Sequence, residues 1–197
     1  MIVLGLTGSL AMGKSTAATL LRQMKIPVHD ADAAVHDLYR NDLPFLRQLY
    51  DYFPECYDRK RKTFDRKQIA DIIFADAGRK KILETLLHPR VQEREKAFLK
   101  KCSRLKQPLV VLDIPLLYET GAEVRCDYVM VVSAPPNVQK SRALSRPGMT
   151  EDIFYKILAT QISDTEKRAR ADFVISTGLG WKRTCAEIRG VLDILGG

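Results

Sequence analysis

The chain has few of the residues that stabilise disulfide-rich or zinc-bound domains. Its four cysteines are scattered without a C-x-x-C pair, and its three histidines lack metal-ligand spacing, so neither a disulfide framework nor a zinc site is indicated. No apolar run approaches the roughly 20 residues that span a bilayer, and the N-terminus lacks the basic flank and cleavage site of a signal peptide. We therefore expect a cytoplasmic protein that does not enter a membrane.

Repeats and low-complexity tracts are also absent. The 197 residues, 46% hydrophobic and 28% charged, suit one sizeable core, or one core that carries an inserted subdomain. The net charge of +8 allows nucleic acid, a membrane surface or a polyanionic small molecule as partner. Its densest cluster, Arg59 to Lys62, is flanked by acidic residues, and the other cations are dispersed. This distribution favours a pocket for phosphorylated ligands over a continuous nucleic-acid-binding face.

The most informative motif lies in the first sixteen residues, MIVLGLTGSLAMGKST. They contain a complete P-loop, Gly8-x-x-x-x-Gly13-Lys14-Ser15, between an apolar run and a helical pattern. In such a loop, successive backbone N–H groups face a polyphosphate, the lysine reaches the β- and γ-phosphates, and the hydroxyl binds Mg²⁺. We predict a site for ATP and Mg²⁺, with Ser15 as a metal ligand. The expected nucleotide contacts are Gly8, Ala11, Met12, Gly13, Lys14, Ser15 and Thr16.

Short apolar segments alternate with helical patterns along the chain, which predicts an α/β fold with a parallel sheet covered by helices on both faces. The strand candidates are 2–6, the residues around Val28, 109–113, 128–132 and 173–175. The region 33–105 interrupts this alternation because it shows only helical patterns. There Asp65 is a predicted N-cap, and Pro89 is predicted to open a long helix.

These patterns predict a single P-loop domain with two insertions. Its core would comprise about 1–32, 106–134 and 168–197, with a helical insertion at about 33–105 and a lid at about 135–167. In the second insertion, Thr150 can cap a helix. Arg142 and Arg146 are candidate lid cations that would neutralise charge on the transferred phosphoryl group. Both can also be solvated residues on a helix surface.

Three carboxylates could serve the chemistry. Asp30 and Asp32 follow the second strand candidate, where a carboxylate can face the P-loop and accept a proton from a substrate hydroxyl. We favour Asp32 as this base. For Asp30, a direct role in the chemistry and a role as the cap of the following helix are both compatible with the sequence. Asp113 ends an apolar strand, as in a Walker B segment, and is either a ligand of Mg²⁺ or a structural residue.

Together these segments resemble the dephospho-coenzyme A kinase family over most of the chain. Beyond the P-loop, the resemblance is carried by Asp30-Ala31-Asp32, His88-Pro89, Asp113-Ile114-Pro115-Leu116-Leu117, Gln139-x-x-Arg142, Arg146, Gln161 and Lys167. It implies a P-loop kinase with a five-stranded parallel sheet that phosphorylates the ribose 3′-hydroxyl of dephospho-coenzyme A at the expense of ATP. Asp32 would match the family's proposed base, Lys14 and Ser15 its phosphate and Mg²⁺ contacts, and Arg142 its lid arginine. The helical insertion at about 33–105 would correspond to the family's coenzyme A-binding subdomain, which binds the acceptor.

Two rival functions share some of these features. A nucleoside or nucleoside-monophosphate kinase would also have the P-loop, the lid and the strand-end Asp, and a nucleic-acid-associated ATPase would account for the positive charge. A GTP-binding switch is disfavoured because no N-K-x-D segment follows the later strands. We expect ATP and dephospho-coenzyme A as partners, no nucleic acid or membrane, and a monomer or weak homo-oligomer.

Overall fold

The computed structural model describes residues 1–196, and the chain divides into two compact units. Unit 1 combines Met1–Asp30 with the chain from Lys100 onward, and unit 2 is Ala31–Leu99. Each unit has its own hydrophobic core.

Unit 1 is built on a five-stranded sheet in which every neighbouring pair of strands is parallel. The strand order is β2-β5-β1-β6-β7. The α/β prediction is therefore confirmed, and each strand candidate lies within an observed strand. The strands are β1 (Ile2–Thr7), β2 (Val28–Asp30), β5 (Leu109–Asp113), β6 (Tyr128–Ser133) and β7 (Phe173–Ser176).

The register aligns the carboxyl ends of the central strands. Asp113 of β5 is paired with Leu6 of β1 on one side and with Asp30 of β2 on the other. The loops that leave these strands therefore start from one edge of the sheet, which is the usual ligand-binding edge of an open α/β fold.

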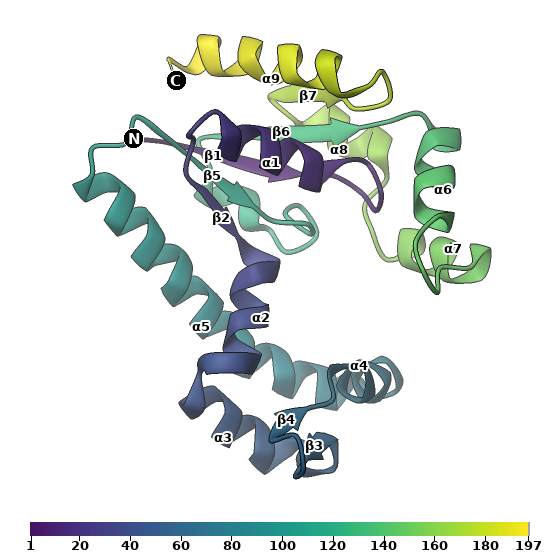
Figure 1. The fold of residues 1–197 in the computed structure, drawn as a ribbon. Helices are drawn as coiled ribbons and strands as arrows, with labels where there is room; N and C mark the ends of the chain where they lie inside the picture. The colour runs from purple at the N-terminus through teal and green to yellow at the C-terminus, as the bar shows by residue number, and fades with distance from the viewer. Residues whose placement is uncertain (197) are drawn as a thin grey trace. The chain divides into compact units, whose positions relative to one another are not determined.

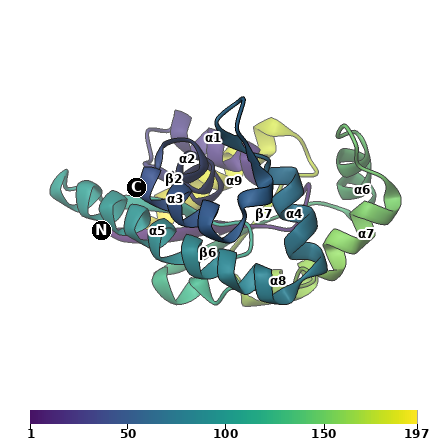
Figure 2. The ribbon, with the colours of Figure 1, turned by 90° about the horizontal axis from the view of Figure 1, so that it is seen from below.

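Helices cover both faces of this sheet (Figures 1 and 2). α1 (Lys14–Gln23) and α9 (Trp181–Leu195) lie on one face, and α8 (Asp164–Arg170) lies on the other. α6 (Pro136–Leu144) and α7 (Glu151–Ala159) lie beyond the carboxyl ends of the strands. The apolar faces of α1 and α9 pack with the strands into one core, which includes Leu4, Leu6, Leu20, Leu21, Leu109, Met130, Val132, Ile188 and Leu192.

Unit 2 is mainly helical and contains a short antiparallel hairpin. Its core gathers Leu38, Phe45, Leu49, Phe53, Ile69 and Leu83. The last helix continues along the chain into unit 1. The elements are α2 (Ala31–Asn41), α3 (Leu43–Tyr52), the 3₁₀ turn Pro54–Cys56, β3 (Tyr57–Asp58), β4 (Thr63–Phe64), α4 (Arg66–Ala75) and α5 (Ala77–Arg104).

Both predicted N-caps are confirmed. The Asp65 side chain accepts hydrogen bonds from the N–H groups of Lys67 and Gln68 at the start of α4. The Thr150 hydroxyl accepts one from Ile153 N–H at the start of α7. Each cap satisfies donors that the first turn of a helix leaves free.

Two local predictions in this region are wrong. The β3–β4 hairpin occupies a stretch for which only helices were expected, because strands of two residues are too short to show alternation. Pro89 lies inside α5 and does not begin a helix. An internal proline costs roughly 3 kcal/mol. Apolar residues pack into the unit 2 core on both sides of it, namely Leu86, Leu87 and Val91, and this continuous packing outweighs the missing N–H.

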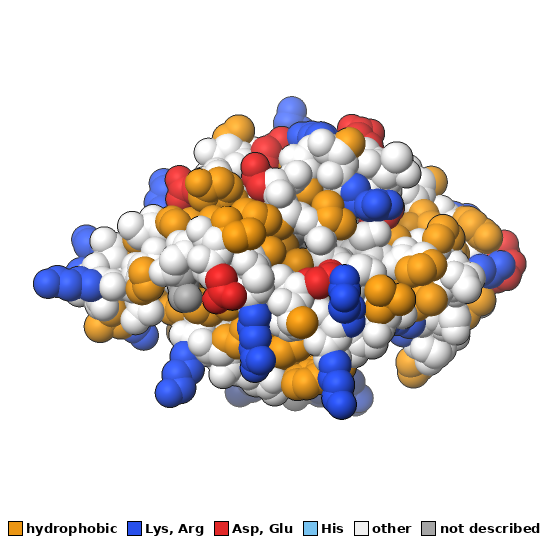
Figure 3. Space-filling model, turned by 90° about the horizontal axis from the view of Figure 1, so that it is seen from above, with side chains coloured by type: hydrophobic (Ala, Val, Ile, Leu, Met, Phe, Trp, Pro, Cys, Tyr) orange, Lys and Arg blue, Asp and Glu red, His pale blue; other side chains and the backbone are white. Residues whose placement is uncertain are grey.

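The positive charge is dispersed over the surface. In Figure 3, lysine and arginine side chains lie among hydrophobic and uncharged groups. Elsewhere in the described chain, and independently of this view, lysines and arginines are paired with carboxylates, among them Lys140 with Glu151, Arg170 with Glu123 and Arg183 with Glu187. This face therefore lacks, among its described side chains, the basic stripe that a nucleic acid would require. Within residues 1–196, no helix combines the length and apolar character that a membrane crossing requires.

Candidate functional site: the P-loop and its surroundings

The predicted P-loop joins β1 to α1 in a tight turn. Gly13, with φ of 94°, precedes α1 and has no side chain that could cap it. A Cβ on Gly13 would lie 2.8 Å from Thr177 Oγ1, and one on Gly8 would lie 2.8 Å from the carbonyl oxygen of Val132. Gly8 is therefore required by its close approach to Val132, and Gly13 by its positive φ and its contact with the Thr177 side chain. The first-turn N–H groups of α1 are available to an anion.

Ala11 in the same loop also has a left-handed backbone, with φ of 61°. This conformation costs a residue with a Cβ roughly 1–2 kcal/mol. The Ala11 side chain is buried against Ala143 of α6 and Phe154 of α7. The contact offsets part of the strain and fastens the tip of the loop to these two helices.

Lys14 and Asp113 form an ion pair at the base of the loop. Lys14 Nζ lies 2.6 Å from Asp113 Oδ1, and the Asp113 side chain is only 3% exposed. Burial raises the pKa of the Asp113 carboxyl, and the charge of Lys14 opposes that rise. The predicted phosphate-binding lysine and the Walker B aspartate are thus brought together by β5 lying next to β1 in the sheet.

Three side chains from distant parts of unit 1 hold the middle of the loop. Gln139 Nε2 donates to the Leu10 carbonyl at 2.8 Å, and Leu10 N–H donates to Gln161 Oε1 at 3.0 Å. The Thr177 hydroxyl donates to the Met12 carbonyl at 2.6 Å. Sequence reasoning assigned these three residues no role, because their contacts with the loop span 129 to 165 residues and leave no local pattern.

The two candidate lid arginines lie in different surroundings. The guanidinium of Arg142, in the last turn of α6, donates to the hydroxyl and the carbonyl of Thr177 at 3.1 and 2.8 Å. Arg142 is therefore linked through Thr177 to the P-loop. Arg146 is exposed in the turn between α6 and α7.

The paired aspartates after β2 are separated by the start of a helix. Asp30 ends β2 in register with Asp113, and its carboxylate lies 3.3 Å from the guanidinium of Arg22. Asp32 is exposed in the first turn of α2, where a carboxylate interacts favourably with the helix dipole. Both were expected at a strand end, and only Asp30 lies there.

A second buried ion pair lies farther along the edge of the sheet. Lys167 of α8 is fully buried, and its Nζ lies 2.7 Å from Glu119 Oε1. The same carboxylate oxygen accepts a hydrogen bond from Ile162 N–H at 2.9 Å. The ion pair ties the loop after β5 to α8, and the hydrogen bond from Ile162 ties the same loop to the segment between α7 and α8.

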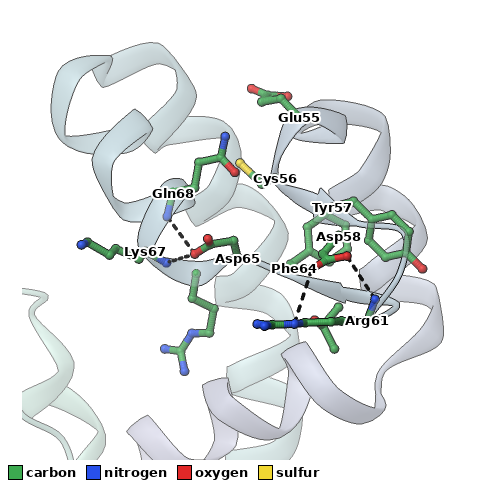
Figure 4. A pocket seen from close by; sticks show the side chains of 11 residues that line it. Glu55, Cys56, Tyr57, Asp58, Arg61, Phe64, Asp65, Lys67 and Gln68 are labelled. Carbon is green, nitrogen blue, oxygen red and sulfur yellow. Dashed lines mark hydrogen bonds and ion pairs between the residues drawn. The ribbon is translucent and has the colours of Figure 1, made fainter.

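Unit 2 contains a hollow of about 540 Å³ beside the β3–β4 hairpin (Figure 4). It is lined by charged and polar groups, including Asp58, Arg61, Asp65, Lys67 and Gln68. The Asp65 carboxylate already accepts the capping hydrogen bonds of α4, and the Asp58 carboxylate is paired with Arg61. In the described part of the chain, no group of three or more His, Cys, Asp or Glu could hold a metal ion.

A P-loop at the carboxyl edge of this parallel sheet, with its lysine paired to a strand-end aspartate, defines a P-loop NTPase. The family model for dephospho-CoA kinase matches residues 2–180. The chain belongs to the dephospho-CoA kinase family.

Individual relatives match nearly the whole chain. The dephospho-CoA kinase of Agrobacterium fabrum is 44% identical over 197 residues, covering 100% of this chain and 99% of the relative. A crystal structure from Thermus thermophilus has a TM-score of 0.86 at 34% identity and covers 100% of this chain and 98% of its own. The dephospho-CoA kinase from Campylobacter jejuni has a TM-score of 0.71 at 26% identity, with 97% and 95% covered.

Proposed function

We propose that the protein transfers the γ-phosphoryl group of ATP to the ribose 3′-hydroxyl of dephospho-coenzyme A and so forms coenzyme A. The observation that carries the proposal is the Lys14–Asp113 pair, buried beneath a P-loop, in a chain that the dephospho-CoA kinase model matches over residues 2–180. Phosphoryl transfer requires charge neutralisation, exclusion of water and an oriented acceptor hydroxyl.

The P-loop supplies the neutralising charge. A polyphosphate seated on the first turn of α1 competes with Asp113 for the ammonium of Lys14, because both are anions within reach of one cation. Lys14 then binds the β- and γ-phosphates, and Asp113 gains a carboxylate oxygen for another ligand.

The donor set suits Mg²⁺. The hydroxyl of Ser15 and the carboxylate of Asp113 are hard oxygen ligands, and Mg²⁺ is commonly held by one or two protein oxygens together with waters and substrate phosphates. Ser15 and Asp113 would hold the ion, which would offset the charge that develops on the phosphates. Such a site does not need a cluster of several protein carboxylates.

Asp32 is our proposed base for the acceptor hydroxyl. Its position two residues after β2 supports this role, because β2 ends at the same edge of the sheet as β1. Asp30 is the less favoured candidate because it already contacts Arg22. The exposed carboxylate of Asp32 is free to accept a proton from a hydroxyl presented to it.

Unit 2 is the proposed acceptor-binding part, and α6 with α7 is the proposed lid. The hollow beside the hairpin carries Arg61, Arg66 and Lys67, cations that suit the pyrophosphate of dephospho-coenzyme A. On the lid, Arg142 is proposed to stabilise the transferred phosphoryl group, and Arg146 to contact the nucleotide.

A substrate-conversion assay tests the proposal. The purified full chain, supplied with Mg²⁺ and ATP, is expected to convert dephospho-coenzyme A to coenzyme A, followed chromatographically, faster than it phosphorylates adenosine or nucleoside monophosphates. Equal or faster phosphorylation of a nucleoside or nucleotide would overturn the assignment. ATP hydrolysis stimulated by DNA or RNA would instead identify a nucleic-acid ATPase.

A further inference from the structure

Both backbone polar groups of one P-loop residue, Leu10, are bound by glutamine side chains. The carbonyl of Leu10 accepts from Gln139 Nε2 at 2.8 Å, and its N–H donates to Gln161 Oε1 at 3.0 Å. Gln139 lies on α6 and is only 6% exposed, and Gln161 follows α7. The two amides therefore hold Leu10 from the two arms of one helical hairpin.

The two glutamines are not interchangeable. A carbonyl can only accept a hydrogen bond and an N–H can only donate one, so Gln139 must present its amide nitrogen and Gln161 its amide oxygen. This assignment depends on the backbone of Leu10 and fixes the direction of each bond. Each bond can therefore be tested separately by a change that keeps either an acceptor or a donor.

The bonds act on the part of the loop that must keep a strained shape. Leu10 precedes Ala11, whose backbone is left-handed and whose side chain packs between α6 and α7. Met12, next in the chain, is held by Thr177. Fixed donors around a phosphate are effective only if the protein holds them in place before the ligand arrives.

We infer that Gln139 and Gln161 are positioning residues that keep the P-loop in its phosphate-binding shape and couple it to the α6–α7 hairpin. The inference rests on the proposed kinase function only through the ATP site, and the identity of the acceptor does not enter it. Loss of either bond leaves a partly buried backbone group of Leu10 without its partner and lets the loop relax.

A pair of variants with equal charge tests the inference. Gln161→Glu retains an oxygen that accepts from Leu10 N–H, whereas Gln139→Glu, when ionised, places an oxygen against the Leu10 carbonyl. Both add one negative charge near the phosphates, so the difference between them reports bond direction. We expect the dissociation constant of ATP, measured calorimetrically without acceptor, to be higher in Gln139→Glu than in Gln161→Glu by a factor on the order of 10.

Acidification provides a second readout. A protonated carboxyl at position 139 can donate to the Leu10 carbonyl, so the gap in ATP affinity between the two variants should narrow as the pH falls. A merely structural role would not produce this pH dependence. Equal ATP affinity in the two variants at neutral pH, or a gap that does not change with pH, would overturn the inference.

Neutral variants keep the test valid if Gln139→Glu does not fold. Gln139→Met and Gln161→Met each remove one bond at similar volume and should each weaken ATP binding by about 5- to 10-fold. Gln48→Met is the matched control, because Gln48 accepts a hydrogen bond from Arg90 in unit 2. If Gln139→Met and Gln161→Met both bind ATP as tightly as Gln48→Met does, the inference is also overturned. If the protein fails to convert dephospho-coenzyme A but the ATP-binding results are as expected, only the proposed acceptor is wrong.

Discussion

The ammonium of Lys14 lies 2.6 Å from the carboxylate of Asp113, so the cation that we propose to bind phosphate is already paired with a buried anion. The pair keeps both charges satisfied inside the protein, where an isolated charge is costly. An arriving polyphosphate must therefore replace an existing partner of Lys14.

The burial of Asp113 predicts a pH-dependent effect of Asp113→Asn on stability, although the charge of Lys14 opposes it. Burial raises the pKa of Asp113 above 3.8, so the folded state binds this proton more tightly than the unfolded chain does. Above the raised pKa, Asp113 is ionised, and this buried charge lowers the free energy of unfolding. The destabilisation fades as the pH falls towards 3.8 and the carboxyl becomes protonated. Relative to Asp113→Asn, the natural chain should gain stability on acidification through this window, as measured by chemical unfolding at a series of pH values. A difference that does not vary with pH would contradict the prediction.

Asp32→Asn should lower kcat by a factor on the order of 10²–10⁴ while ATP still binds, because the amide cannot accept the hydroxyl proton. Steady-state kinetics and equilibrium ATP binding measure the two effects separately. Asp30→Asn is the matched control, since Asp30 contacts Arg22 at the end of β2. A larger loss of kcat in Asp30→Asn than in Asp32→Asn would transfer the role of base to Asp30.

Arg142→Ala should slow phosphoryl transfer more than it weakens ATP binding, because a guanidinium near the transferred group acts mainly on the transition state. Single-turnover kinetics and calorimetry distinguish the two quantities. Lys140→Ala removes a cation from the same helix whose partner is Glu151 and should leave both nearly unchanged. If Arg142→Ala weakens ATP binding but leaves the rate of phosphoryl transfer unchanged, Arg142 supports the P-loop through Thr177 and does not act on the transferred group.

Lys167→Met should cost about 3–5 kcal/mol of unfolding free energy, because it leaves the carboxylate of Glu119 buried without its cation. Urea unfolding measures the loss. Arg183→Met, which breaks the exposed pair with Glu187, should cost less than about 1 kcal/mol. Similar losses in the two variants would mean that burial of the Lys167–Glu119 pair does not matter.

Gly190→Ala should stabilise the protein by about 0.5–1 kcal/mol, because it removes a flexible residue from the exposed face of α9. An added Cβ there meets no atom within 4 Å. Gly13→Ala should destabilise it instead, since its Cβ would clash with Thr177. Thermal unfolding compares the melting temperatures of the two variants with that of the natural chain. If both variants shift the melting temperature in the same direction, this explanation is wrong.

The sequence predicted the parts of the fold whose signals are local. The apolar run of β5 corresponds to residues 109–113 and ends at Asp113, and the P-loop spacing placed Lys14 at the start of α1. Pro89 misled the prediction because tertiary packing on both sides of it continues α5. The β3–β4 hairpin was missed because strands of two residues are too short to show an alternation of apolar and polar residues.

The candidate site was predictable only in its local motifs. Lys14 and Asp113 belong to recognisable motifs, but their ion pair depends on β5 lying next to β1. Gln139 and Gln161 belong to the segments that carry the family resemblance, but nothing in the sequence indicated that both bind the backbone of Leu10, since a glutamine is compatible with many contacts. Nor did anything in it indicate the contact of Thr177, whose hydroxyl reaches a carbonyl 165 residues earlier.

The attachments of the P-loop also determine when it can form during synthesis. The loop is made before its partners, because its strand needs β5 and β6 as neighbours and its backbone is held by the later residues Gln139, Gln161 and Thr177. Contacts so distant in sequence form late and slow folding. A nascent chain that ends before residue 177 therefore carries the whole nucleotide motif without a finished binding site, and ATP can stabilise the molecule only once the segments up to residue 177 have emerged from the ribosome.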